Sequence, residues 1–230
     1  MAIVSVIYHS LRDHTTRQAD AIVRGASAVE GVETHLLRLS HEQIGAGGRW
    51  DDPAVLRTLN ASDGIVFGSV TLFGTVSAVF KAFLESTFGV WYEQGWKDKF
   101  AGGFTNSAAL NGDKQVTLMM LLTYAAQMGM LWVPMGDHPG ANWSGADRDG
   151  VNRLGSFLGP MAQSDSDTSL DASPTPGDVL TAERYGERFA RIVQHWLREG
   201  DYQTPRARDA AATAAFRKAG LDATAIGNLT

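Results

Sequence analysis

Short runs of apolar residues alternate along this chain with segments of helical periodicity, and this alternation limits the possible folds more than any other feature. The runs at residues 3–8, 32–37, 64–68, 100–105 and 131–133 each have the length of a strand. The segments between them place apolar residues at the spacing of a helix with one buried face. Because strands separated by helices form βαβ units, the sequence predicts an α/β fold with a doubly wound, five-stranded parallel sheet and helices on both faces.

One domain and a tail account for the length of 230 residues. The domain is expected over residues 1–198, and its last apolar helical face closes at about Arg198. Residues 136–181 show no period and are rich in Gly, Pro, Ser, Asn and Asp, so we expect a long loop or insertion there; loops of this length are usually functional or disordered. The tail, residues 199–230, is Ala-rich and has room for one helix at residues 210–219.

The composition excludes several classes of function. A net charge of −5 argues against nucleic acid as a partner, because nonspecific binding to polyanions needs a concentrated basic surface. No apolar stretch approaches the roughly 20 residues of a membrane span, so we expect no membrane insertion. The chain has no Cys, which excludes disulfides and thiolate nucleophiles and fits a cytoplasmic protein. The spacing of its six His and its carboxylates resembles no metal site, and we predict none.

Polar loops follow the first, third and fourth expected strands: HSLRDHTT, GSVTLFG and FTNSAALNGDKQ. In doubly wound sheets, ligands bind outside the carboxyl ends of the strands. The first loop enters a helix at about Thr15, whose N–H groups and dipole suit a phosphate, with hydroxyl donors on Ser10 and Thr15. An ordinary helix cap uses the same residue types, and Asn-Gly also occurs in ordinary turns. Three such loops at one sheet edge favour a binding site over three unrelated turns.

These loops resemble those of the flavodoxin-like family, in particular WrbA-type NAD(P)H:quinone oxidoreductases and NADPH-dependent FMN reductases. Ser10-x-x-x-His14-Thr15 is similar to the family's phosphate loop, residues 68–74 to the loop beside the isoalloxazine ring, and residues 104–115 to the loop around the pyrimidine edge. The similarity covers most of residues 1–198 and implies FMN as cofactor. The cofactor-binding residues that it implies are Ser10, Leu11, Arg12, Asp13, His14, Thr15, Val70, Thr71, Leu72, Phe73, Gly74, Asn106, Ser107, Ala108, Asn111, Gly112 and Met128.

The chain departs from the family pattern at four of these positions. Asp13 stands where many members have Gly, and it would place a negative charge near the phosphate unless Arg12 compensates. Val70 and Leu72 stand where Pro and Arg are usual. Met128 replaces a His that often lies over the flavin, so we expect no proton relay there. No catalytic side chain is expected, because the flavin carries the chemistry.

Trp91 and Arg12 are the residues expected to meet substrates. Trp91 stands where the family has an aromatic residue that packs on the quinone in a neighbouring subunit's active site, although a Trp after an apolar helix is as common in a core. Arg12 suits a phosphate of NADPH or NADH, because guanidinium groups bind phosphate through paired hydrogen bonds. The resemblance also implies a homo-oligomer, either a dimer or a tetramer. Residues 152–164 resemble the region that closes over the cofactor or joins subunits, and a plain surface loop is the alternative.

Three functions remain open at this point. The first is an enzyme that transfers two electrons from NADPH or NADH through FMN to a quinone, in a ping-pong sequence. The second is an electron-carrier flavodoxin, although such carriers tend to be shorter and more acidic. The third is a scaffold that keeps the fold without flavin, to which Asp13 gives some support. Trp91 and the insertion at residues 136–181 favour the enzyme.

Overall fold

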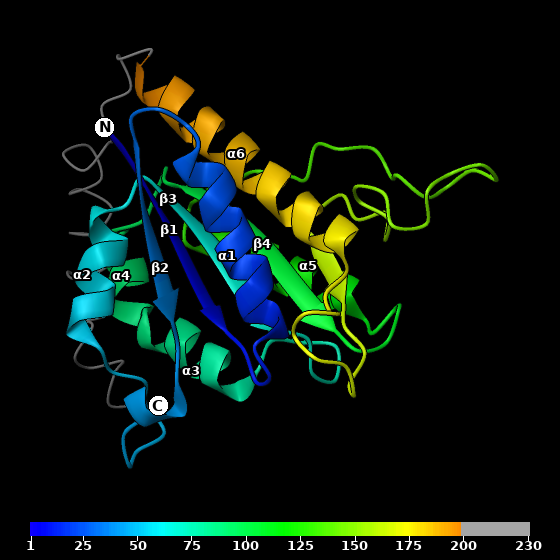
Figure 1. The fold of residues 1–230 in the computed structure, drawn as a ribbon. Coiled ribbons are helices and arrows are strands. Elements are labelled where there is room, and N and C mark those ends of the chain that lie inside the picture. The colour runs from blue at the N-terminus through cyan, green and yellow to red at the C-terminus, as the bar shows by residue number, and fades with distance from the viewer. Residues whose placement is uncertain (199–230) are drawn as a thin grey trace.

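A parallel sheet with the strand order β2-β1-β3-β4-β5 runs through the centre of the protein (Figure 1). The computed structural model describes residues 1–198, so the tail and the helix predicted at residues 210–219 lie outside the described residues. The strands of this order are β1 (Ala2–His9), β2 (Val32–Arg38), β3 (Gly64–Val70), β4 (Phe100–Ser107) and β5 (Leu131–Trp132). This is the flavodoxin-like sheet that the sequence predicts.

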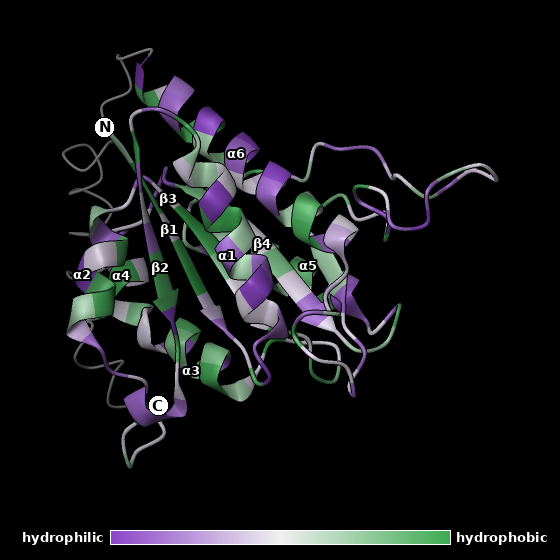
Figure 2. Cartoon of the chain, viewed as in Figure 1, coloured by the Kyte–Doolittle hydropathy of each residue, from purple (hydrophilic) through white to green (hydrophobic). Residues whose placement is uncertain are grey.

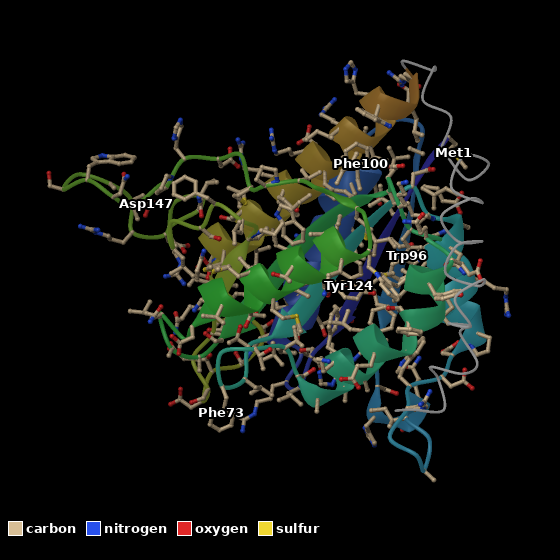
Figure 3. The ribbon with its side chains drawn as sticks, turned by 180° about the vertical axis from the view of Figure 1, so that it is seen from behind. Met1, Phe73, Trp96, Phe100, Tyr124 and Asp147 are labelled. Atoms are coloured by element: carbon tan, nitrogen blue, oxygen red, sulfur yellow. The ribbon has the colours of Figure 1, made fainter. Side chains whose placement is uncertain are left out.

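Helices cover both faces of the sheet, as Figures 1 and 3 show from opposite sides. One face carries α1 (His14–Ser27) and α6 (Pro176–Arg198). The other face carries α2 (Pro53–Ala61), α3 (Ala78–Ser86), α4 (Phe88–Tyr92) and α5 (Lys114–Gln127). A short 3-10 helix, His41–Gln43, follows β2. Apolar residues concentrate in β1 and β3 at the centre of the sheet, and polar residues lie on the outer surface of α6 (Figure 2). Burial on both faces explains why β1, β3 and β4 read as nearly continuous apolar runs. Among residues 1–198, no helix is long and apolar enough to cross a membrane.

The fifth strand is split into two pieces, whereas the sequence pattern predicts one strand at residues 131–133. Both β5 and β6 (Met161–Gln163) pair in parallel with β4, β5 at its first residues and β6 at its last. Residues 133–160 leave the sheet between the two pieces, and the loop around Asp147 extends away from the body (Figures 1 and 3). The chain returns so close to β4 that a Cβ added to Gly159 would come within 1.9 Å of the Gly103 carbonyl oxygen. The insertion therefore completes the sheet at the carboxyl end of β4.

Helices α1 and α6 touch through their backbones. A Cβ on Gly25 would lie 1.8 Å from the carbonyl oxygen of Glu183, and a Cβ on Gly186 would lie 2.0 Å from that of Ile22. Any larger residue at either glycine would push the helices apart. This contact fixes α1, and with it the loop that enters α1 from β1.

Candidate functional site

The three polar loops meet at one edge of the sheet, because parallel strands end on the same side. Residues 10–15 follow β1, residues 70–74 close β3 and residues 106–112 close β4, all at the lower edge of Figure 1. The structure therefore brings together the cofactor-binding residues predicted on these loops. Met128 and Trp91 lie elsewhere, as described below.

The first loop places two buried hydroxyl groups at the start of α1. Ser10 and Thr15 are 5% and 2% exposed, and the Ser10 Oγ has no hydrogen-bond partner within the described chain. Helix α1 has 14 residues, so its first N–H groups carry a full helix dipole. An anion placed there would satisfy both the helix end and the Ser10 hydroxyl.

Asp13 adopts the left-handed conformation, with φ of 60°, directly before α1. Glycine adopts this conformation freely, and Asp is among the few other residues that tolerate it. The Asp13 carboxylate lies 2.8 Å from the Arg38 guanidinium, whereas Arg12 donates to the carbonyl oxygen of Ser166 at 2.7 Å. The expectation that Arg12 compensates the charge of Asp13 is therefore wrong. Arg38, at the end of β2, pairs with the Asp13 carboxylate instead.

Two further buried polar atoms near this edge lack partners among residues 1–198: the His9 Nδ1 and the Asn106 Oδ1. Burial lowers the pKa of His9 below its usual value, and Arg38 and His41 lower it further, so His9 is a neutral hydrogen-bonding group. Leaving a buried polar atom unpaired costs about 1–3 kcal/mol. Together with the Ser10 Oγ, these atoms form a set that a polar ligand would satisfy.

The loop after β3 is a tight two-residue turn. Leu72 and Thr75 exchange backbone hydrogen bonds of 2.9 and 3.1 Å around Phe73 and Gly74, whose φ angles are 48° and 75°. Positive φ at both central residues defines a type I′ turn, which normally carries Asn-Gly. Phe73 is fully exposed in this unfavourable conformation (Figure 3).

Threonine hydroxyls fix the base of this loop. The Thr71 Oγ1 lies 2.7 Å from the Thr105 Oγ1 and 2.8 Å from the Thr117 Oγ1, which joins the ends of β3 and β4 to α5. The side chain of Thr71 is thus used within the protein. Residues 72–74 are the part of this loop that remains exposed to a ligand.

The loop after β4 is organised by Lys114, which no sequence pattern marks as a site residue. Lys114 is fully buried, and its Nζ donates to the Ser107 Oγ and to the carbonyl oxygens of Ala109 and Leu110. Gly112 has φ of 54°, and a Cβ there would lie 2.0 Å from the Ser107 Oγ. The hydroxyl of Ser107 also donates to Ala109 within the loop.

The insertion lies against two of the three loops. Gln163, in β6, donates to the carbonyl oxygen of Ala108 at 2.9 Å, and Arg12 reaches Ser166. Arg17, on α1, donates to the carbonyl oxygen of Leu170. These contacts hold the insertion against the loops that follow β1 and β4 and against α1.

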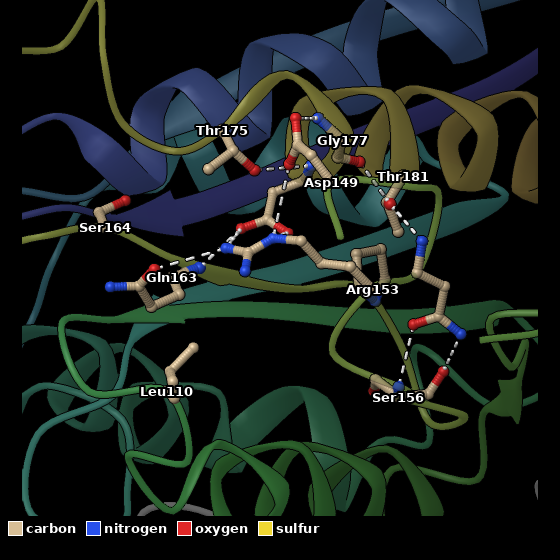
Figure 4. A network of polar contacts seen from close by, with 12 residues as sticks. Leu110, Asp149, Arg153, Ser156, Gln163, Ser164, Thr175, Gly177 and Thr181 are labelled. Atoms are coloured by element: carbon tan, nitrogen blue, oxygen red, sulfur yellow. Dashed lines mark hydrogen bonds and ion pairs between the residues drawn. The ribbon is translucent and has the colours of Figure 1, made fainter. Parts of the chain in front are cut away.

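A buried ion pair holds the insertion to α6 (Figure 4). The Arg153 guanidinium contacts both oxygens of the Asp178 carboxylate, each at 2.8 Å, and the Gln163 N–H donates to the same carboxylate at 2.9 Å. Burial raises the pKa of Asp178, while the hydrogen bond from Arg153 opposes that rise. Gln163 also donates to the Ala108 carbonyl oxygen, so the ion pair helps to position a residue that holds the loop after β4.

Trp91 and Met128 line a separate, open groove of about 1310 Å³ between the α3–α4 segment and α5. Other residues lining it are Trp50, Leu84, Met120 and Tyr124. Helix α5 runs for 14 residues from Lys114, so Met128 lies about 20 Å from the β4 loop, taking 1.5 Å per residue. Within one chain, these two residues do not reach the edge where the three loops meet.

Within residues 1–198, no group of three His, Asp or Glu side chains lies close enough together to hold a metal ion. The polar groups at the sheet edge are hydroxyls, an amide oxygen, an imidazole and backbone N–H groups. Such a set suits an organic ligand with a phosphate and polar ring atoms.

Comparison with known proteins identifies the family. A family model of NADPH-dependent FMN reductases matches residues 3–139. Flavodoxin FldP of Pseudomonas aeruginosa is 40% identical over 189 residues, which cover 82% of this chain and 95% of that protein. Quinone-oxidoreductase QR2 of Triphysaria versicolor is 36% identical over 147 residues, covering 60% of this chain and 72% of that protein.

A solved structure agrees with these matches. The flavodoxin, WrbA-like protein from Agrobacterium tumefaciens superposes with a TM-score of 0.61 at 33% identity, over 85% of this chain and 99% of that chain. The family match includes the loops after β1, β3 and β4. The chain therefore belongs to the NADPH-dependent FMN reductase family, in its flavodoxin and WrbA-like group of flavin-binding oxidoreductases.

Proposed function

We propose that the protein binds FMN at the carboxyl edge of its sheet and transfers two electrons from NADPH or NADH to a quinone. The observation that carries the proposal is the set of buried, unpaired polar atoms at this edge, the Ser10 Oγ, His9 Nδ1 and Asn106 Oδ1, beside the start of α1. FMN offers a phosphate for the helix end and polar ring atoms for the neighbouring loops. When bound, it supplies the redox chemistry by accepting an electron pair from one substrate and passing it to the other.

The protein's own residues then have positioning roles. Ser10, Thr15 and the first N–H groups of α1 hold the phosphate, and the backbone of residues 72–74 and 108–112 borders the ring. Arg12 is exposed, so its guanidinium is available to a phosphate of the pyridine nucleotide if it exchanges Ser166 for that ligand. The pairing of Asp13 with Arg38 removes the charge argument for a flavin-free scaffold.

A homo-oligomer, dimer or tetramer, gives Trp91 and Met128 a role that one chain cannot give them. Both line the groove on the α5 face, away from their own chain's loops. We place a second copy against this face, so that Trp91 helps to form the quinone pocket of its neighbour. Aromatic residues at such interfaces often contribute most of the binding energy.

An electron carrier is the second candidate, favoured by the 40% identity to Flavodoxin FldP. A carrier exchanges electrons with other proteins and needs no pocket for NAD(P)H or a quinone. The family match to NADPH-dependent FMN reductases and the identity to QR2 support the enzyme.

Steady-state kinetics separate the two candidates. With NADPH or NADH varied against a benzoquinone, double-reciprocal plots should give parallel lines, because donor and acceptor use the same face of the flavin in turn. Trp91→Ala should leave FMN binding unchanged and lower kcat/KM for the quinone about tenfold, the effect of losing an interface aromatic worth more than about 1 kcal/mol. Converging lines would contradict the ping-pong sequence. A protein that binds FMN but shows no turnover with either nucleotide is a carrier.

A further inference from the structure

Lys114 is buried without an acidic partner in contact with it. As the first residue of α5 it is 0% exposed, and its Nζ donates to the Ser107 Oγ at 2.9 Å and to the carbonyl oxygens of Ala109 and Leu110 at 2.8 and 2.9 Å. Three acceptors use all three N–H donors of the ammonium group. Burial lowers the pKa of Lys114 to about 8, so the group remains mostly protonated at neutral pH. A cation is thus fixed inside the loop that follows β4.

The side chains of Lys114 and Gln163 hold three successive carbonyl groups of this loop. Gln163 donates to Ala108 at 2.9 Å, and Lys114 holds the next two carbonyls. The only cis peptide bond among residues 1–198 is Ser173–Pro174, so the loop is trans throughout. In a trans peptide, the N–H points opposite to the C=O. The N–H groups of the following residues therefore point away from Lys114 and Gln163.

These three N–H groups, of Ala109, Leu110 and Asn111, make no hydrogen bond to any part of the chain that the structure describes. Their residues are exposed, whereas Lys114 is buried on the other side. The loop thus presents successive free donors on its open side, at the carboxyl end of β4. Successive backbone N–H groups of this kind bind anionic or acceptor-rich groups.

We infer that Lys114 is a positioning residue that orients these N–H groups toward the acceptor atoms of the FMN ring, and that it thereby favours the reduced cofactor. The inference rests on the proposed function. Reduction by two electrons with uptake of one proton adds one negative charge to the ring, and the electrons come from NAD(P)H. Fixed donors and a buried cation stabilise that added charge without reorganisation. The nearby Asp178 carboxylate pairs with Arg153 at 2.8 Å, so the hydrogen-bond partners of the Lys114 ammonium group are a hydroxyl and two carbonyl groups of the loop and no carboxylate.

The test compares reduction midpoints of the FMN-loaded protein at pH 7. Lys114→Met removes the cation and two carbonyl contacts, and Gln163→Ala removes the contact to Ala108. Arg191→Met is the matched control, because it removes an exposed cation about 22 Å along α6 from its first residue at 1.5 Å per residue. Each protein is titrated anaerobically with xanthine, xanthine oxidase and a reference dye, and the affinity for oxidised FMN is measured by fluorescence.

Lys114→Met should lose about tenfold in its preference for reduced over oxidised FMN, which lowers the midpoint by about 30 mV for a two-electron couple. Gln163→Ala should shift the midpoint in the same direction by less, and Arg191→Met should match the wild type. Midpoints of both loop variants equal to that of Arg191→Met, with FMN bound, overturn the inference. If Lys114→Met does not fold, an unshifted Gln163→Ala overturns it alone. A wild-type protein that takes up no FMN refutes the proposed function instead.

Discussion

Replacing Ser10 and Thr15 together by alanine should weaken FMN binding by about 2–4 kcal/mol. The estimate takes charge-assisted hydrogen bonds at about 1.5–3 kcal/mol each and discounts for overlap between them. Both side chains are buried at the start of α1, and the Ser10 Oγ finds no partner among the described residues, so a phosphate is the acceptor that its position suits. Fluorescence titration of the apoprotein with FMN measures the effect.

Ser27→Ala is the matched control for this pair, because Ser27 carries a hydroxyl at the other end of the same helix and contacts Thr34. Its FMN affinity should equal that of the wild type. If the double variant binds FMN as tightly as Ser27→Ala does, the phosphate does not lie at the start of α1.

Replacing Arg153 by methionine should lower the free energy of unfolding by about 3–5 kcal/mol, because it leaves the buried carboxylate of Asp178 without its cation. The Asp178 side chain is 2% exposed and that of Arg153 is 12% exposed, so water cannot substitute for the lost partner. Urea denaturation followed by circular dichroism measures the change. Arg148→Met, in the same insertion but exposed, should change stability by less than about 0.5 kcal/mol.

The pH dependence of this variant identifies the cause. Burial already raises the pKa of Asp178, and loss of Arg153 should raise it further. A carboxyl whose pKa is higher in the folded state binds more protons there than in the unfolded chain, so it destabilises the fold increasingly as pH rises above the unfolded pKa. The deficit of Arg153→Met should therefore shrink on acidification. The double variant with Asp178→Asn should regain part of the lost stability; a deficit equal to that of the single variant at every pH would point to lost packing.

The fold was predictable from sequence because its signals are local. The apolar runs that form β1, β3 and β4 are buried on both faces, and each can be recognised from a few consecutive residues. The edge at which the three polar loops meet followed from topology, because the loops after parallel strands lie on one side of the sheet. The positions of the three loops therefore needed no knowledge of side-chain contacts.

The second half of the edge strand was not predictable in this way. Only three residues, Met161–Gln163, form β6, and they carry no period that distinguishes them from the surrounding loop. Their pairing with Thr105 to Ser107 is set by the return of the insertion to β4, which is a tertiary contact. Sequence patterns indicate local burial, but they do not indicate that a distant segment folds back to pair with β4.

Charged residues at the site were the hardest to interpret, because their partners are distant in sequence. A Lys at the first position of a helix normally faces solvent, and Lys114 is buried only because the folded loop supplies three acceptors. Asp13 looked like a charge beside the phosphate, but Arg38, 25 positions away in sequence, pairs with it at 2.8 Å. The one local indication was the residue type, because Asp is among the few residues other than Gly that tolerate the left-handed conformation found at position 13.

The most direct test of FMN binding and its chemistry is the visible spectrum of the purified protein during anaerobic titration. Supplied with FMN and freed of excess, the protein should be yellow, lose its colour when NADPH or NADH is added, and regain it with a benzoquinone. This outcome requires a flavin bound at a site open to both substrates. Failure to retain FMN at high micromolar concentration would contradict the account, because the unpaired polar atoms at the sheet edge would then belong to a different ligand.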